Sequence, residues 1–197
     1  MRLLAAVAER VRRPDLLQAF AALSVLLTFA LAVGWPGTGD PNLSWTGVAQ
    51  ARSVLLLLLG GYIGVFSATE VPGRLETLLA LPVIVLLALP VEALAYAVSY
   101  PPVPVWWLVA QPLLDVMAYF GVGLALGGTT RRIAALWPLL PPLLFVGLLG
   151  ASIGLELPLL NPLATAARVS WIHLAASLVL ALATCAWCIR ANILHGD

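Results

Sequence analysis

Long apolar stretches constrain the fold of this chain more than any other feature of its sequence. Six of them are separated by polar residues or by proline and glycine. A membrane-spanning helix needs about 20 apolar residues, and each stretch is close to that length. They cover residues 16–33, 48–66, 78–98, 105–126, 133–154 and 171–189. With 62% hydrophobic and 10% charged residues, the chain has the composition of a membrane protein.

The apolar stretches favour helices over a transmembrane β-barrel. Barrel strands are segments of about ten residues in which apolar and polar residues alternate, whereas residues 55–59 and 83–89 are apolar at every position. We therefore expect an all-α polytopic membrane protein with six transmembrane helices. Residues 1–197 then form a single transmembrane domain, which leaves no room for a second, soluble domain.

The distribution of arginine predicts the orientation, because positively charged loops stay on the cytoplasmic side. If the N-terminus is inside, the inner side carries every arginine of the chain except Arg52 and Arg168. Both termini are then cytoplasmic, in a cytoplasmic (inner) membrane of bacterial or archaeal type. The outer connections are residues 34–47, 99–104 and 155–170. The tryptophans expected at that outer edge, where indole rings are most stable, are Trp35, Trp45, Trp106, Trp107 and Trp171.

Residues 1–14 precede the first apolar stretch and carry their own pattern. Leu3, Leu4, Val7 and Val11 recur at helical spacing opposite charged residues. This pattern predicts an amphipathic helix that lies on the inner membrane surface. The alternative is an ordinary charged flank of the first membrane span.

The inner connection between the second and third stretches, residues 70–82, predicts a short amphipathic helix. Leu75, Leu78 and Leu79 share one face of such a helix. Pro82 disfavours α conformation at the residue before it, so we expect about two turns that are exposed to the cytoplasm. Such a helix can lie on the bilayer or insert its leucines into a groove on a partner. A connector without a partner is the alternative.

Two motifs in the loops carry a resemblance. In residues 70–82, an acidic residue and a glycine precede Leu-Glu-x-Leu-Leu-x-x-Pro; the matching residues are Glu70, Gly73, Leu75, Glu76, Leu78, Leu79 and Pro82. The second motif, an Asn-Pro-Leu stretch that ends in Arg, consists of Asn161, Pro162, Leu163, Thr165 and Arg168. The first resembles the coupling-helix segment of type-2 ABC exporter permeases, and the second resembles the outer-loop motif before their last span. Arg74 departs from the pattern, since the family usually has Thr or Ser there.

The resemblance implies the transmembrane permease subunit of an ATP-driven ABC exporter, which moves a small or lipid-like substrate. Such a subunit pairs with a second copy or a similar chain in the lipid membrane. It docks onto a separate ATPase subunit, here through Glu70, Gly73, Arg74, Leu75, Glu76, Leu78, Leu79 and Pro82. ATP and Mg then bind to that partner, because this chain has neither G-x-x-x-x-G-K-[S/T] nor any lysine. We expect no catalytic residues, cofactor or metal on this chain, and a net charge of +1 argues against a nucleic-acid partner.

Two other functions stay open at this stage. One is a six-helix substrate-binding subunit of a vitamin-type importer, which also needs a separate ATPase module. The other is a haem or cofactor-assembly permease, which would share the exporter architecture and differ in cargo.

Polar residues inside the apolar stretches are costly and need partners. Arg52 and Glu92 lie at comparable depth, which predicts a structural ion pair. Gln111, Asp115 and Tyr119 are spaced four apart and share a helix face. We expect this face, together with Glu92, to line a translocation path or gate. The alternative is a buried hydrogen-bond network between helices.

Glycines in the second stretch predict close packing of helices. Gly60, Gly61 and Gly64 form a patch of small residues that lets two helix backbones approach. We favour packing within the chain over a contact between subunits.

A Gly-x-Ser-x-Gly pattern at residues 150–154, with His173 downstream, fits the nucleophile elbow of serine hydrolases. That elbow needs a turn between a strand and a helix, whereas Ser152 lies in an apolar stretch expected to be helical. We therefore expect no hydrolase, and we interpret His173 as a neutral histidine at the membrane interface.

Overall fold

The computed structural model describes residues 41–68, 74–99, 103–130, 143, 147 and 169–195. Four long helices run through these residues: α3 (Pro41–Ser67), α4 (Arg74–Ser99), α5 (Trp107–Thr130) and α8 (Trp171–His195). Parts of three are long and apolar enough to cross a membrane, namely Thr46–Ser67, Trp107–Gly128 and Trp171–Ile193. The described part of the chain is therefore all-helical, as expected, with three candidate membrane spans.

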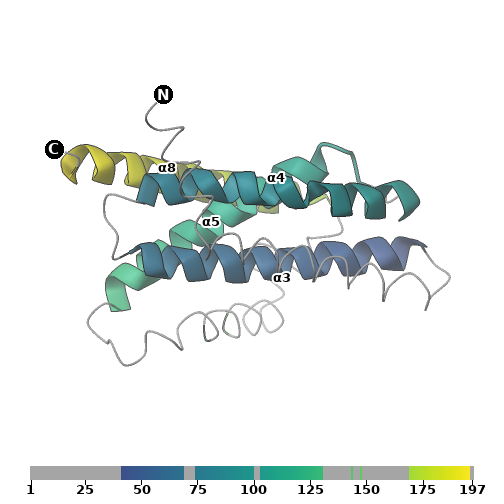
Figure 1. Ribbon diagram of the computed structural model, residues 1–197, viewed down its shortest axis with the longest axis horizontal. Helices are drawn as coiled ribbons and strands as arrows, with labels where there is room; N and C mark the ends of the chain where they lie inside the picture. Colours follow the sequence, from purple (N-terminus) through teal and green to yellow (C-terminus); the bar gives the residue numbers. More distant parts are fainter. Residues whose placement is uncertain are drawn as a thin grey trace.

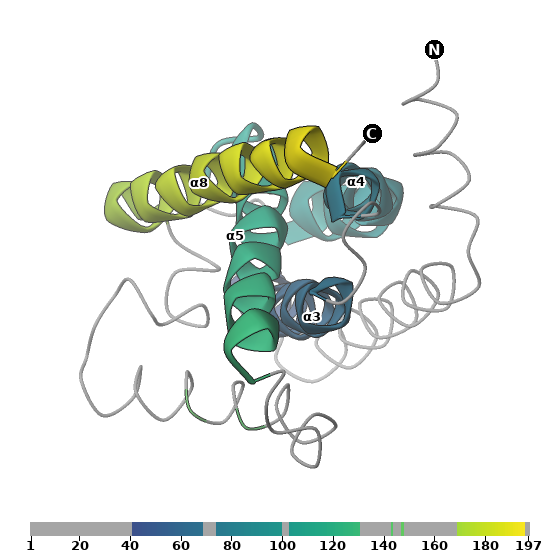
Figure 2. The ribbon, with the colours of Figure 1, turned by 90° about the vertical axis from the view of Figure 1, so that its left-hand side faces the viewer.

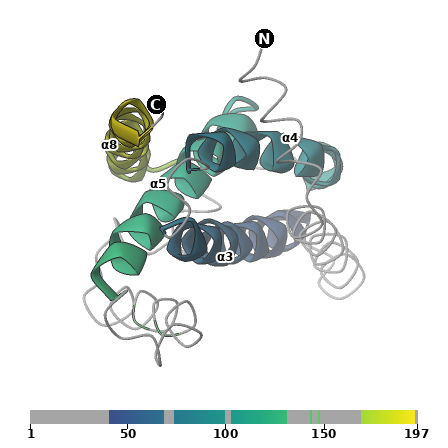
Figure 3. The ribbon, with the colours of Figure 1, turned by 60° about the vertical axis from the view of Figure 1, so that its left-hand side comes forward.

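The four helices form a bundle in which α5 contacts each of the other three. Figure 1 shows α3 and α4 running lengthwise, one above the other, with α5 passing obliquely between them and α8. In Figure 2, α3 and α4 are seen nearly end-on, while α8 lies across one side of α5. Figure 3 shows α3 and α8 on different sides of α5. The central position of α5 makes it the helix on which polar contacts converge.

The two ends of the bundle carry different residues and are named from them. At the Trp end, α5 and α8 begin side by side: the ring of Trp106 lies 5.6 Å from that of Trp107 and 5.7 Å from that of Trp171. At the Arg74 end, α3 finishes and α4 begins. Three of the five tryptophans that the sequence places at one edge, Trp106, Trp107 and Trp171, therefore meet, although Trp107 is fully buried.

Apolar side chains from all four helices fill the centre of the bundle. This core cluster consists of Leu56, Ala68, Leu78, Leu81, Val85, Val116, Phe120, Leu124 and Cys188. Because lipid is as apolar as these side chains, van der Waals packing and interhelical hydrogen bonds hold membrane helices together. Close packing is therefore where the fold gains its stability.

Glycine sets the distance between α3 and α5. A Cβ atom added at Gly60 would lie 2.8 Å from the carbonyl oxygen of Val116, and one added at Gly64 would overlap that of Phe120. A Cβ at Gly61 would meet nothing within 4 Å. The predicted packing within the chain is therefore confirmed at Gly60 and Gly64, where only glycine fits.

One predicted helix boundary is wrong, and one helix is longer than the membrane span predicted in it. Helix α3 begins at Pro41, inside the expected connection 34–47, and proline is favoured in a first helical turn; its candidate membrane span, Thr46–Ser67, begins close to the predicted residue 48. Helix α4 runs from its first residue, Arg74, through Pro82 and Pro90 without a break. A separate two-turn helix before the third span is therefore absent. Prolines are tolerated inside membrane helices because neighbouring groups satisfy the backbone groups they free.

Several predictions lie outside the described residues. These are the surface helix at 1–14, the stretches 16–33 and 133–154 except residues 143 and 147, Glu70 and Gly73, and the motif with Asn161, Pro162 and Arg168.

Candidate functional site

The first buried polar cluster, called the arginine cluster, consists of Arg52 on α3, Glu92 on α4 and Gln111 on α5. Arg52 Nη1 lies 2.6 Å from Glu92 Oε2, and Arg52 Nη2 donates to Gln111 Oε1 at 3.1 Å. Each of the three residues is 1% exposed. The structure thus brings together the two residues that the sequence paired, and adds Gln111. One guanidinium joins three helices.

Full charges at bilayer depth explain why this cluster is so closely paired. Insertion of a lone Arg or Asp at the centre of a membrane helix costs about 2.5–3.5 kcal/mol. The planar guanidinium presents five donors in a fixed fork, so Arg52 serves Glu92 and Gln111 at once. The positive charge of the guanidinium and the negative charge of the carboxylate cancel. The cluster is therefore neutral as long as Arg52 and Glu92 stay paired.

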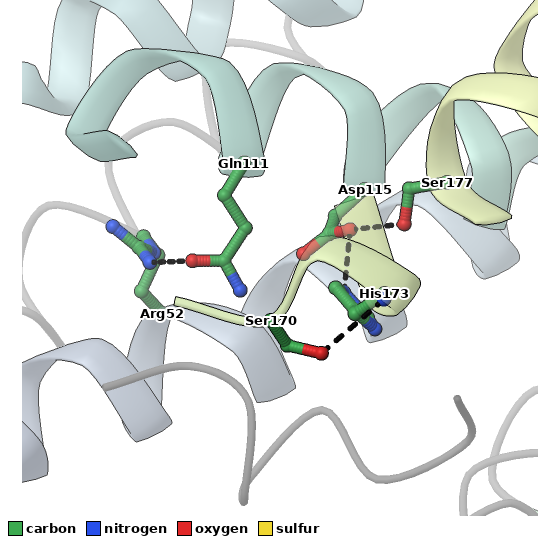
Figure 4. A network of polar contacts seen from close by, with 6 residues as sticks. All are labelled: Arg52, Gln111, Asp115, Ser170, His173 and Ser177. Atoms are coloured by element: carbon green, nitrogen blue, oxygen red, sulfur yellow. Dashed lines mark hydrogen bonds and ion pairs between the residues drawn. The ribbon is translucent and has the colours of Figure 1, made fainter. Parts of the chain in front are cut away.

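The second buried polar cluster, called the aspartate cluster, consists of Asp115 on α5 with His173 and Ser177 on α8. Figure 4 shows both α8 side chains directed at the carboxylate. His173 Nε2 lies 2.9 Å from Asp115 Oδ1, and Ser177 Oγ donates to the same oxygen at 2.7 Å. When Asp115 is ionised, its oxygen accepts and Nε2 carries the proton that is donated. Exposure is 1% for Asp115, 3% for His173 and 6% for Ser177.

The beginning of α8 orients this cluster. The backbone N–H of His173 donates to Ser170 Oγ at 3.3 Å, so Ser170 caps the helix from the position just before it. Ser170, His173 and Ser177 are spaced three and four apart, which places them on one helix face. This polar stripe was the signal in the sequence that could have identified the α8 side of the cluster.

The described contacts place the predicted polar residues inside the bundle. Gln111 and Asp115 are each 1% exposed and bond to neighbouring helices, as in the network of hydrogen bonds given above as the alternative to a gate. Tyr119 is half-buried, beside Gly60. The ring of His173 is buried in the bundle, where it contacts Asp115, and its position at the membrane interface stays a prediction.

At the Arg74 end, a second arginine fixes the connection between two helices. Arg74 Nε donates to the carbonyl oxygen of Ser67 at 3.1 Å, and Arg74 Nη2 donates to that of Ala68 at 2.5 Å. The last carbonyl groups of a helix have no partner within it, and an arginine nearby can cap them. The first residue of α4 is therefore attached to the last turn of α3.

The leucine face predicted in residues 70–82 divides between the core and the surface. Leu78 is fully buried in the core cluster, and Leu75 packs against that cluster. Leu79 and Glu76 are half-buried. Glu76 Oε2 is shielded from solvent and has no hydrogen-bond partner in the described part of the chain. Because α4 is continuous, its first turns belong to the bundle, and Leu78 is not exposed for docking.

The described residues contain no group of three or more His, Cys, Asp or Glu side chains that could hold a metal ion. Cys185 and Cys188 on α8 are free thiols, and Cys188 belongs to the core cluster. The polar chemistry of the described helices therefore lies in the two clusters and in the cap at Arg74.

Comparison of the chain with protein-family models, curated proteins and solved structures finds no match.

Proposed function

We propose that this chain is the transmembrane permease subunit of an ATP-driven exporter similar to type-2 ABC exporters. It moves a small or lipid-like substrate across the cytoplasmic membrane, paired with a second copy or a similar chain. A separate ATPase subunit binds ATP and Mg and supplies the energy. Six membrane spans with both termini in the cytoplasm complete this proposal, and the three candidate spans of the described residues are compatible with it.

One observation carries the proposal. The motif of residues 70–82 contains the beginning of helix α4, and this beginning is attached to the end of helix α3. Arg74 donates to two carbonyl groups at the end of α3. A force applied to the beginning of α4 therefore acts on α3 at the same time.

The arginine cluster extends this connection to a third helix. Arg52, on the α3 helix that Arg74 caps, is bonded to both α4 and α5. ATP-driven movement at the Arg74 end would thus displace α3, α4 and α5 together. Energy enters as a difference in the affinity of the ATPase for two states of the permease.

The burial of Leu78 changes which residues would contact the ATPase. Leu78 and Leu75 hold the helix in the bundle, so the contact falls to the half-buried Leu79 and Glu76. Glu76 is half-buried, and a carboxylate there suits a basic side chain or a backbone N–H on the ATPase.

Site-specific photo-crosslinking tests the proposal in the full-length chain, expressed from its native locus. We expect a crosslinker at Leu79 to capture a protein with a nucleotide-binding P-loop. The same group at Leu78 is the matched control and should capture none, because that side chain is fully buried. Purification of the Leu79 adduct should give ATPase activity that falls when Glu76 is replaced by Ala.

Two outcomes would contradict the exporter proposal. Capture of a membrane scaffold without a P-loop at Leu79 would favour the substrate-binding subunit of an importer. Transport by the purified chain, with residues 74–79 replaced by a neutral linker and no ATPase present, would remove the need for an external energy source.

A further inference from the structure

The buried ionisable side chains of the described helices carry equal positive and negative charge only if the Asp115–His173 pair holds one additional proton. Arg52 and Glu92 neutralise each other at 2.6 Å. Asp115 is equally buried, and the one side chain in contact with it that can become positive, among the residues described, is His173. If the imidazole is neutral and the carboxyl group is ionised, one negative charge is left uncompensated among the described residues. Membranes penalise such a charge.

We propose that Asp115 and His173 form a proton-binding site, and that the bound proton controls how tightly α8 is held against α5. In the protonated state, an imidazolium faces an ionised carboxylate and the site is neutral. After release of the proton, a neutral imidazole faces the same carboxylate and the site carries one negative charge.

The position of the added proton follows from the contact with an ionised Asp115. In that state Nε2 of His173 donates to Asp115 Oδ1, 2.9 Å away, so the added proton is carried on Nδ1 of the same ring. No covalent bond other than N–H forms or breaks, and water is the proton donor. His173 lies in the first turn of α8, beside Trp171 and Ile172, which are 66% and 61% exposed. The site therefore lies close to the Trp end of the bundle.

The proton strengthens the contact between α5 and α8. The hydrogen bond to an ionised carboxylate is already stronger than one between neutral groups, and protonation of His173 adds the attraction between two opposite charges. Both hydrogen bonds described between side chains of α8 and α5 end on Asp115 Oδ1. Helix α8 is also less enclosed than α3 and α5. In its most apolar segment 28% of the residues are buried, against 50% in the corresponding segments of α3 and α5. The loss of charge therefore acts where α8 has few other attachments.

Other ionisable groups also lie in the buried part of the described helices. Tyr119 on α5 interacts electrostatically with Asp115, and tyrosine ordinarily keeps its proton up to about pH 10. Arg52 on α3 and Glu92 on α4 form an ion pair at 2.6 Å. Histidine is the side chain that ordinarily changes charge between pH 5 and 8. The test therefore observes the imidazole of His173 itself, not a global change of state.

Nuclear magnetic resonance of labelled histidine tests the site in the full-length chain, in phosphatidylcholine nanodiscs. The chain has two histidines, so a His195→Gln background leaves His173 as the single signal. We expect a doubly protonated imidazole at pH 6 that converts to the neutral form as the pH rises to 8. In Asp115→Asn, we expect the neutral form already at pH 6.

Ser177→Ala is the matched control, because it removes a neutral donor from the same carboxylate oxygen. It should leave the imidazole doubly protonated at pH 6. The proposal is overturned if His173 in the native sequence stays neutral down to pH 5, or if Asp115→Asn titrates like the native sequence. Titration of the native chain decides the matter even if Asp115→Asn fails to fold.

Hydrogen exchange measures the consequence for α8. After correction for the intrinsic pH dependence of exchange, amides of residues 171–180 should exchange at least about fivefold faster at pH 8 than at pH 6, because loss of the ion pair removes at least about 1 kcal/mol of attraction. His173→Gln should abolish this difference. Equal corrected rates at the two pH values in the native chain would show that the proton does not control α8. Neither measurement involves an ATPase, so failure of the exporter proposal leaves this test intact.

Discussion

The helices α3, α4 and α5 are held together differently from α8. The first three share a guanidinium that bonds to two neighbours, a glycine-lined contact and a cap at the Arg74 end. Helix α8 is bonded to α5 through one carboxylate oxygen, and much of its surface is exposed. The arginine cluster is neutral because it contains one positive and one negative side chain. The aspartate cluster is neutral only when it binds an added proton. A rigid unit and an adjustable helix can therefore exist in one small bundle.

This difference follows from the donors that each helix supplies. Arginine stays charged at every pH of interest and offers five N–H groups. Histidine offers one or two, and its charge depends on pH. A helix attached through Arg52 is therefore held permanently, and one attached through His173 is held conditionally.

Breaking the ion pair should give the largest loss of stability. Glu92→Leu leaves Arg52 buried and uncompensated, and we expect the free energy of unfolding to fall by about 3–5 kcal/mol. Reversible unfolding of the full chain in mixed micelles measures this. The double variant Arg52→Leu with Glu92→Leu should recover most of the loss, because a hydrophobic pair can replace a buried ion pair. A double variant as unstable as the single one would show that the pair has no such role.

The glycine contact tests the same rigid unit without any charge. Gly64→Ala places a methyl group against the backbone oxygen of Phe120, and such overpacking costs typically about 1–3 kcal/mol. We expect a value near the upper end, because backbone cannot move aside as a side chain can. Gly61→Ala is the control and should be neutral or slightly stabilising, since nothing lies within 4 Å of the added atom. Equal effects at the two positions would contradict the described contact.

Removal of the carboxylate tests the attachment of α8. Asp115→Leu leaves His173 and Ser177 without their acceptor, and we expect a loss of about 2 kcal/mol. The loss is smaller than for Glu92→Leu because no charge is stranded. Hydrogen exchange should show increased opening in α8, with α3 and α4 unchanged. If all four helices open together, α8 is part of the rigid unit and the comparison fails.

The smallest effect should come from the neutral donor of that site. Ser177→Ala removes one hydrogen bond of 2.7 Å, worth about 1 kcal/mol. His173 still donates to Asp115 in this variant, so α8 stays attached. Thermal unfolding at pH 6 measures the effect, and Ser53→Ala is a control, because Ser53 Oγ has no partner among the described residues. A loss larger than that of Asp115→Leu would be inconsistent with the carboxylate as the centre of the site.

Sequence patterns predicted those parts of the fold that depend on the polarity of a residue and on its depth along an apolar stretch. The apolar stretches located the described helices, and the comparable depth of Arg52 and Glu92 anticipated their contact. Patterns failed where neighbouring helices decide the outcome. Pro82 reads as a helix end in water, but α4 continues through it. Its first turns then pack inside the bundle, which buries Leu78 rather than exposing it.

The aspartate cluster shows a second limit. Asp115 was recognisable as costly, but its partner lies 58 residues away on another helix. A single histidine near a helix start is ordinarily read as interfacial. The stripe formed by Ser170, His173 and Ser177 indicates a polar face, yet the identity of the helix it meets depends on the angle at which α8 crosses α5.

The pairing of Arg52 with Glu92 also bears on how the chain is made. Arg52 leaves the ribosome 40 residues ahead of its counter-ion, so α3 alone would bring an unmatched charge into lipid, at a cost of about 2.5–3.5 kcal/mol. The cost disappears once α4 arrives. The insertion machinery is therefore expected to retain α3 until α4 has been synthesised, and to release the two as a hairpin.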